Sequence, residues 1–187
     1  MSEPLSDLEA LKQVANGDKK GLETLYTRYS NRTFKFLLRL TTNRTAAEDL
    51  THDVFLEVWK SAKRFEARST VATWIFSIAR YKAYDQGRRQ KTLTEHDLPT
   101  PPEPTPESMA MQASSSDYMR ACLSALSLEH REIIDLVYYH DMSVKEASEI
   151  LDIPEATVKT RMFYARRKLK EMLLAEGDQN DVFSYGK

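Results

Sequence analysis

The sequence has little of what a secreted or membrane-spanning protein needs. Its 187 residues include one cysteine, Cys122, so the chain cannot form an internal disulfide. No apolar run approaches the roughly 18 residues that cross a bilayer. Residues 1–4 are acidic and lead into no apolar stretch, so we expect no signal peptide. A reducing, cytoplasmic compartment without membrane insertion is the simplest expectation.

Motifs for catalysis and cofactor binding are also missing. The sequence has no P-loop, no GxGxxG and no HExxH. Cys122 is expected to be a buried small hydrophobe. The four histidines are scattered and are expected at the surface or in turns rather than as metal ligands: His52, His96, His130 and His140. We therefore expect no enzyme, metal, cofactor or small-molecule substrate.

The net charge of −1 hides an uneven distribution along the chain. Residues 1–92 carry 17 Lys and Arg against 11 Asp and Glu, a balance of +6. The balance is −4 over residues 93–116 and −3 over residues 117–187, yet residues 159–170 hold six basic side chains and no acid. A local basic stripe of this kind is what contacts with phosphates require.

A proline cluster divides the chain. Five of the seven prolines lie between Pro99 and Pro106, where fixed φ angles and missing N–H groups exclude a helix or a central strand. We expect an acidic, extended linker over 93–115. It separates a domain over 1–92 from a second domain over 116–177, which a polar tail over 178–187 follows.

Both domains are predicted to be helical. Three capping-box patterns mark helix starts, at Ser6 with Glu9, Thr45 with Glu48, and Ser143 with Glu146. No alternating hairpin pattern or internal repeat is present. The expected fold class is all-α, with two small helical domains joined by the proline-rich linker.

The helix that follows Thr45 has two distinct faces. A core stripe is predicted at Ala47, Leu50, Val54 and Val58. The opposite side carries an exposed leucine beside acids, with Asp49, Asp53, Leu56 and Lys60. This side is either a docking face or an ordinary solvated surface, and the pattern alone leaves both open.

The C-terminal domain has the pattern of a helix-turn-helix. A short apolar-faced helix from Ser143 is broken at residues 152–154, and a second helix begins near Pro154. The second helix directs Val158, Met162, Ala165 and Leu169 to the core and Ala156, Thr160, Phe163 and Arg167 outward. An outward phenylalanine among cations favours a recognition helix in a DNA major groove over a solvated basic helix. A preceding helix over about 127–139 packs behind it, with Ile133, Ile134 and Val137.

Aromatic and basic residues also alternate in the N-terminal domain. A loop over 65–69 precedes a helix that begins at Ser69 or Thr70 and runs to about Asp85. Cations that follow a backbone and rings that stack on unpaired bases suit single-stranded DNA. We expect Trp74 to belong to the core, and for Tyr81 and Tyr84 both interpretations stay open. One side of the helix is predicted to carry Thr73, Phe76, Ser77, Arg80 and Tyr84.

Three segments resemble one protein family. Residues 47–59, residues 69–80 with Asp85 and residues 88–89, and residues 154–161 with residues 165–166 are similar to regions two and four of bacterial extracytoplasmic-function (ECF, group IV) sigma factors of RNA polymerase. The segments are in the family's order and at its distances. His52 departs from the usual glutamine and Tyr81 from the common asparagine.

The resemblance implies two DNA-binding surfaces. The recognition helix would read the −35 promoter element through Lys159, Thr160, Arg161, Phe163, Arg166 and Arg167. The loop over 65–69 would hold a flipped base of the −10 non-template strand and the next helix its backbone. These roles fall on Phe65, Arg68, Ser69, Arg80, Tyr84, Arg88 and Arg89.

The resemblance also implies protein partners. A helix face would dock on the clamp helices of core RNA polymerase, with a further contact at the flap, and an anti-sigma factor would silence the chain in a stress response. The docking residues would be Asp49, Asp53, Leu56 and Glu57. The alternative function is a polymerase-independent helix-turn-helix regulator. It leaves the aromatic-basic N-terminal helix unused and calls for a dimer interface that the sequence does not reveal.

Overall fold

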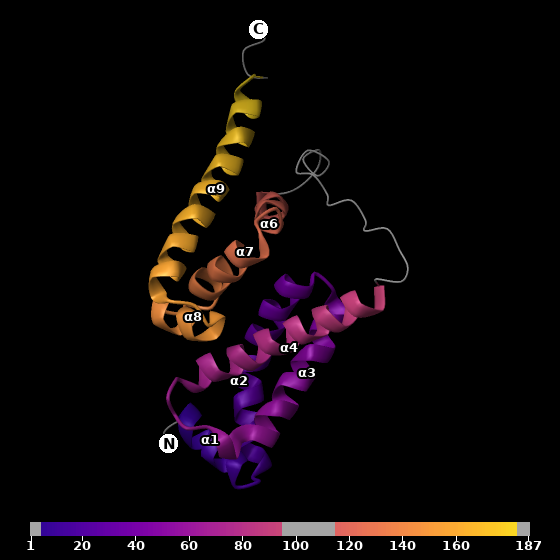
Figure 1. The fold of residues 1–187 in the computed structure, drawn as a ribbon, viewed down its shortest axis with the longest axis vertical. Coiled ribbons are helices and arrows are strands. Elements are labelled where there is room, and N and C mark those ends of the chain that lie inside the picture. The colour runs from indigo at the N-terminus through magenta and orange to yellow at the C-terminus, as the bar shows by residue number, and fades with distance from the viewer. Residues whose placement is uncertain (1–4, 95–114, 183–187) are drawn as a thin grey trace.

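The computed structural model describes residues 5–94 and 115–182, which form two helical domains (Figure 1). No strand occurs within these ranges, which confirms the expected fold class. The N-terminal domain comprises α1 (Asp7–Ala15), α2 (Lys19–Thr41), α3 (Arg44–Ser61), the 3₁₀ turn η1 (Ala62–Arg64) and α4 (Val71–Thr94). The C-terminal domain comprises α6 (Ser115–Ser124), α7 (Leu128–Ile134), the π-helical turn η2 (Asp135–Tyr139), α8 (Val144–Leu151) and α9 (Glu155–Val182).

Two of the three predicted capping boxes are confirmed. Ser6 and Ser143 each accept a hydrogen bond from a backbone N–H at the third helical position, and the glutamate there reaches back. The third prediction is wrong, because Asn43 caps α3 and its side chain accepts a hydrogen bond of 3.0 Å from the Ala46 N–H. Glu48 instead forms an ion pair with Arg44 at 2.9 Å.

Helices α2, α3 and α4 enclose the N-terminal core, and α1 packs across α2. Each helix contributes side chains at helical spacing, so that one face of each is apolar and buried. Fully buried side chains from the three helices include Phe36, Leu37, Val54, Val58 and Ile75. The predicted core stripe of α3 is therefore confirmed, with Ala47, Leu50, Val54 and Val58 all buried.

The helix-turn-helix consists of α8 and α9. Asp152 ends α8 in the left-handed conformation with φ 54°, and the Ser148 hydroxyl donates a hydrogen bond of 2.6 Å to the Ile153 carbonyl. Val158 and Ala165 of α9 are fully buried, as predicted. Helix α7 begins at the Ser127 cap, and η2 widens its last turn into a π-helix.

The regular structure extends past two of the predicted boundaries. Helix α4 continues to Thr94, two residues into the expected linker, and α9 continues to Val182, into the expected tail. The proline cluster over 99–106 lies outside the described residues. No described helix has the length and apolar character needed to cross a membrane.

The two domains pack directly against each other. Helix α8 lies against α4, and α7 lies against α2 (Figure 1). Buried apolar side chains of both domains form one continuous cluster, in which Ile133 and Leu136 of the C-terminal domain join Phe36 and Phe76 of the N-terminal domain. This arrangement covers one side of α4, which is the helix to which the sequence assigns strand binding.

Candidate nucleic-acid interface

The outward face of α9 carries the residues predicted to read duplex DNA. Lys159 and Thr160 are exposed, and the Phe163 side chain is 57% exposed. The Thr160 hydroxyl donates to the Ala156 carbonyl at 2.9 Å, so its oxygen remains an acceptor for a base edge. Because Val158 and Ala165 anchor the opposite side of the helix, this face is held rigidly outward.

The four flanking aromatic and basic side chains on α9 differ in their surroundings. Arg166 and Arg167 are exposed, and the Arg167 guanidinium lies 5.0 Å from the ring centre of Tyr164. Tyr164 packs edge-on against Phe163, so this face of α9 carries a second aromatic ring that the helical pattern did not predict there. Arg161 is half-buried and forms an ion pair of 3.1 Å with Glu129 of α7, so it lies at the edge of the face rather than on it.

The loop before α4 holds the next group of predicted contacts. Phe65 is half-buried against Trp74, with ring centres 5.1 Å apart. Trp74 itself is half-buried rather than fully within the core. Arg68 is exposed and forms an ion pair of 2.6 Å with Glu66, and Ser69 is half-buried. Phe65 therefore packs against α4, whereas the Arg68 side chain is exposed to solvent.

Arg80 and Tyr84 lie side by side on α4 and share one partner, Glu132 of α7. The Arg80 Nε donates to Glu132 Oε1 at 3.0 Å, and the Tyr84 hydroxyl donates to Glu132 Oε2 at 3.0 Å. The Arg80 guanidinium also lies 4.6 Å from the Tyr84 ring centre. The role of Glu132 could not be predicted from the sequence, because its contacts cross from one domain to the other over 48 and 52 residues.

Burial changes the titration of this group. The loss of water around Glu132 raises the pKa of its carboxyl, against the opposing effect of the Arg80 charge. Burial and the neighbouring Glu132 carboxylate raise the pKa of Tyr84 to about 12, so the phenol keeps its proton and acts as a donor at neutral pH. The two cations further along α4, Arg88 and Arg89, are exposed and lie 3.6 and 2.9 Å from Asp85.

The predicted exposed side of α4 requires a correction. Thr73 and Phe76 are fully buried, because α8 and His140 cover this side of α4 and Phe36 of α2 also packs against the Phe76 ring. Phe76 packs against the buried His140 ring, with centres 4.8 Å apart, and the Thr73 hydroxyl lies 3.3 Å from Glu146 Oε1. His140 lies in the bend after η2, in keeping with the expected turn position, but it is buried there against Phe36 and Phe76. Tyr81 is 66% exposed and lies outside the core.

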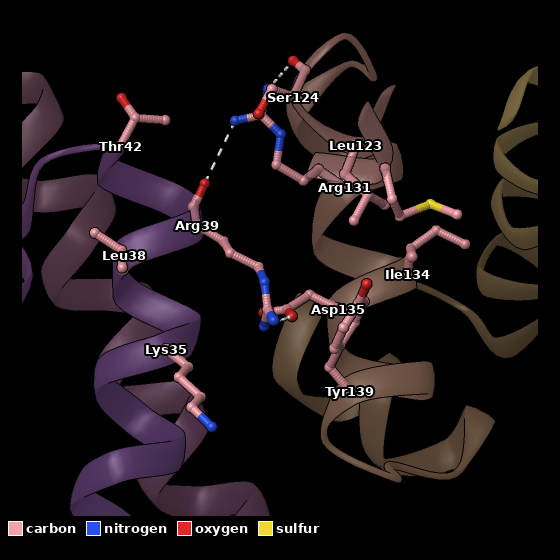
Figure 2. Close-up of a pocket in the computed structure, with 11 residues that line it drawn as sticks. Lys35, Leu38, Arg39, Thr42, Leu123, Ser124, Arg131, Ile134, Asp135 and Tyr139 are labelled. Carbon is pink, nitrogen blue, oxygen red and sulfur yellow. Dashed lines mark hydrogen bonds and ion pairs between the residues drawn. The ribbon is translucent and has the colours of Figure 1, made fainter. Parts of the chain in front are cut away.

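A cleft lies between the two domains. It has a volume of about 610 Å³, and α2, α6 and α7 line it. Figure 2 shows Arg39 of α2 reaching Asp135, with which it forms an ion pair, and Arg131 donating to the Arg39 carbonyl at 3.4 Å. On the other side of the interface, the Arg32 guanidinium donates to the His140 carbonyl at 2.5 Å.

The docking face predicted on α3 is exposed. Asp49 and Asp53 are open to solvent, and the Leu56 side chain is 52% exposed. Glu57 is half-buried and turns toward cations of the same domain, with Arg64 and Lys82 each 3.9 Å away. An apolar groove of about 450 Å³ adjoins Leu56 between α2 and α3, with Leu22, Tyr26, Phe55 and Trp59 along it.

Within 5–94 and 115–182, no group of three or more His, Cys, Asp or Glu side chains is arranged to hold a metal ion. Cys122 is buried, as predicted. His96 lies outside the described residues.

Comparison with known proteins identifies the family. The family model of sigma-70 region 2 matches residues 25–92, and that of sigma-70 region 4 matches residues 116–169. The ECF RNA polymerase sigma factor SigX of Bacillus subtilis is 30% identical over 172 residues, which cover 86% of this chain and 89% of SigX. SigM of the same organism is 29% identical over 154 residues, 81% of this chain and 94% of SigM.

A solved structure supports the same assignment. The sigma factor RpoE in complex with the anti-sigma factor NepR from Bartonella quintana has a TM-score of 0.67 with this chain at 25% identity. The match covers 82% of this chain and 97% of RpoE. With both family regions in order and relatives aligned over most of its length, the chain belongs to the ECF sigma factors of RNA polymerase.

Proposed function

We propose that the chain binds core RNA polymerase and directs it to promoters by reading the −35 duplex with α9 and capturing the melted −10 non-template strand with the 65–69 loop and α4. The observation that carries this proposal is the outward face of α9. Phe163 stands more than half exposed between Thr160 and Arg167, on a helix whose other side is anchored in the core. An apolar ring held outward among cations fits a thymine methyl in a major groove flanked by phosphates.

The strand-binding role rests on the row of side chains along α4. Arg80, Tyr84 and Arg88 are spaced by four residues, so they follow one side of the helix at intervals of about 6 Å. That repeat is close to the spacing of nucleotides in an extended strand. Val71, at the start of α4 just after the loop, lies about 14 Å before Arg80 along the helix axis, from a rise of 1.5 Å per residue. A strand could therefore run from the loop along α4.

The polymerase-docking role rests on α3. Leu56 projects beside two exposed acids, Asp49 and Asp53, and the groove lined by Tyr26 and Trp59 extends the apolar surface. An exposed apolar centre with a charged rim is the composition of a protein interface. Glu57, held by Lys82 and Arg64, belongs to the rim in this proposal.

The proposal extends to regulation and location. RpoE of Bartonella quintana is described in complex with an anti-sigma factor, and we propose a partner of that class for this chain. The chain acts on promoters with core polymerase, so its place is the cytoplasm, and it contributes binding and strand capture while polymerase supplies the chemistry.

Loss of the Phe163 ring is expected to weaken −35 recognition. Promoters are first selected from a randomised library by run-off transcription with bacterial core polymerase. On a selected promoter, Phe163→Ala should reduce the preference for the intact −35 element over a scrambled one by roughly tenfold, since a lost base contact costs about 1–3 kcal/mol. Lys159→Ala should reduce the same preference.

Leu174→Ala is the matched control, because Leu174 is an apolar residue on the same helix and is 59% exposed. It should leave the −35 preference unchanged. An unchanged preference in Phe163→Ala would mean that α9 presents a different face to DNA. Failure of the wild-type chain to start transcription at any defined position with core polymerase would remove the sigma-factor function altogether.

A further inference from the structure

The buried carboxylate of Glu132 occupies the strand-binding side of α4. Its side chain is 1% exposed, and its two oxygens accept the Arg80 and Tyr84 hydrogen bonds. A DNA phosphate would require the same donors, because anionic oxygens are what guanidinium and phenol groups bind. Glu132 therefore stands where the backbone of a captured strand would lie.

The same packing covers other parts of that side of α4. Glu146, at the start of α8, lies 3.3 Å from the hydroxyls of both Thr70 and Thr73. Phe76 is fully buried and packs against the His140 ring. A strand that runs from the 65–69 loop along α4 would thus meet α7 and α8 before it reached Arg80.

Beside its apolar cluster, the interface also buries polar groups that are incompletely satisfied. His140 Nε2 lies 3.4 Å from Asp135 Oδ2, but neither atom, nor His140 Nδ1, has a hydrogen-bond partner among the described residues. Burial without a partner costs about 1–3 kcal/mol for each polar group. Separation of the domains would return these groups, and the buried Glu132, to water. The closed arrangement therefore combines specific ion pairs with a cost that opening relieves.

We infer that the free chain is autoinhibited: α7 and α8 of the C-terminal domain close over α4, and Glu132 binds Arg80 and Tyr84 in place of the −10 strand. The inference rests on the proposed strand-binding role of α4. In it, the strand-binding surface becomes available when the C-terminal domain leaves α4, a change that docking of both domains on polymerase would drive. Apparent affinity for the strand in the free chain is reduced by the fraction of molecules that are closed.

Two charge reversals of opposite sign should open the chain. Glu132→Lys faces Arg80 with a second cation, and Arg39→Glu faces the buried Asp135 with a second anion. Both changes keep the Arg80 and Tyr84 side chains themselves, and Arg39→Glu also keeps their contacts with Glu132. Because one variant adds positive charge and the other adds negative charge, a shared gain in DNA binding cannot come from net charge. Glu149→Lys and Arg44→Glu, both at exposed positions, are the matched controls.

Distance measurement tests closure without DNA. Spin labels at Lys20→Cys and Lys170→Cys, both exposed, report the interdomain distance in a full-length chain that carries Cys122→Ala. We expect one narrow distance distribution for wild type and both controls, and broader, longer distributions for Glu132→Lys and Arg39→Glu. Circular dichroism checks that every variant keeps its helical content. Identical distributions in wild type and both charge reversals would overturn the closed state.

Strand binding tests whether closure inhibits. The probe is a fluorescein-labelled oligothymidylate, titrated with the full-length chain in the absence of polymerase. Both charge reversals should bind it at least about tenfold more tightly than wild type, which corresponds to an open fraction of about one in ten or less. Opening without a gain in affinity would overturn autoinhibition. Adding Arg80→Ala to Arg39→Glu separates the two proposals. Closure is judged from the spin-label distances alone, whereas an oligothymidylate affinity equal to that of Arg39→Glu would remove the strand-binding role of Arg80.

Discussion

Replacing Gly21 with alanine is expected to destabilise the N-terminal domain by roughly 3 kcal/mol, because α1 crosses α2 at this residue without room for a side chain. A Cβ on Gly21 would lie 2.3 Å from the Ala10 carbonyl oxygen and 2.7 Å from the Gln13 Cβ. Both distances are well inside the 3.5–4.0 Å or so at which non-bonded atoms pack best. The Ala10 oxygen belongs to the helix backbone, so α1 as a whole would have to move.

Gly87 provides the matched control for this substitution. It also lies within a helix, α4, but a Cβ there would have no neighbour within 4 Å. Gly87→Ala should therefore stabilise the chain by about 0.5–1 kcal/mol, through the better helix propensity of alanine. Urea unfolding followed by circular dichroism measures both variants. If Gly21→Ala were as stable as Gly87→Ala, the close crossing of α1 and α2 would be absent from the protein in solution.

The parts of the structure that could be predicted from the sequence depend on neighbours within one or two helical turns. The apolar stripe of α9 at Val158 and Ala165 repeats at helical spacing, so the outward position of Phe163 followed without knowledge of the rest of the chain. The caps at Ser6 and Ser143 are equally local, since each involves residues three apart.

Local patterns also explain the error at the start of α3. Thr45 and Glu48 have the spacing of a capping box, but Asn43 is a stronger cap and lies two residues earlier. Its side chain captures the Ala46 N–H, so Thr45 falls inside the helix. Two overlapping start signals compete here, and helix propensity at Arg44 does not decide between them.

The buried side of α4 could not be predicted for a different reason. Helical periodicity places Thr73 and Phe76 across from the apolar positions Val71 and Ile75 of the same helix, so the pattern assigns both to solvent. Their burial depends on residues far away in the chain, because Glu146 of α8 lies against Thr73, and Phe76 packs against both Phe36 of α2 and His140. The ion pair of Arg80 with Glu132 could not be predicted from a single sequence, because any acidic residue of the C-terminal domain is an equal candidate for the partner of Arg80.

Removing the Arg80 side chain is expected to reduce run-off transcription from a duplex promoter by roughly 10–100-fold. A hydrogen bond to a charged group is worth about 1.5–3 kcal/mol, and each 1.4 kcal/mol or so is a factor of ten in the open fraction of promoter complexes. Arg80→Lys should recover part of the loss, since it keeps the charge but not the guanidinium fork that also stacks on Tyr84. Arg44→Ala is the control, because its exposed pair with Glu48 contributes about 0–1 kcal/mol.

The template separates strand capture from other roles of Arg80. On a promoter whose −10 element is mismatched and already open, strand separation is complete before the chain binds, so the opening equilibrium lies far to the open side. The same loss of about 1.5–3 kcal/mol then leaves most complexes open, and Arg80→Ala should reduce run-off about threefold or less. Permanganate reactivity of unpaired thymines measures the open fraction on both templates. On the mismatched promoter, prior melting removes the need for strand capture to drive opening. An equal loss of run-off on the duplex and the mismatched promoter would therefore place the action of Arg80 at another step.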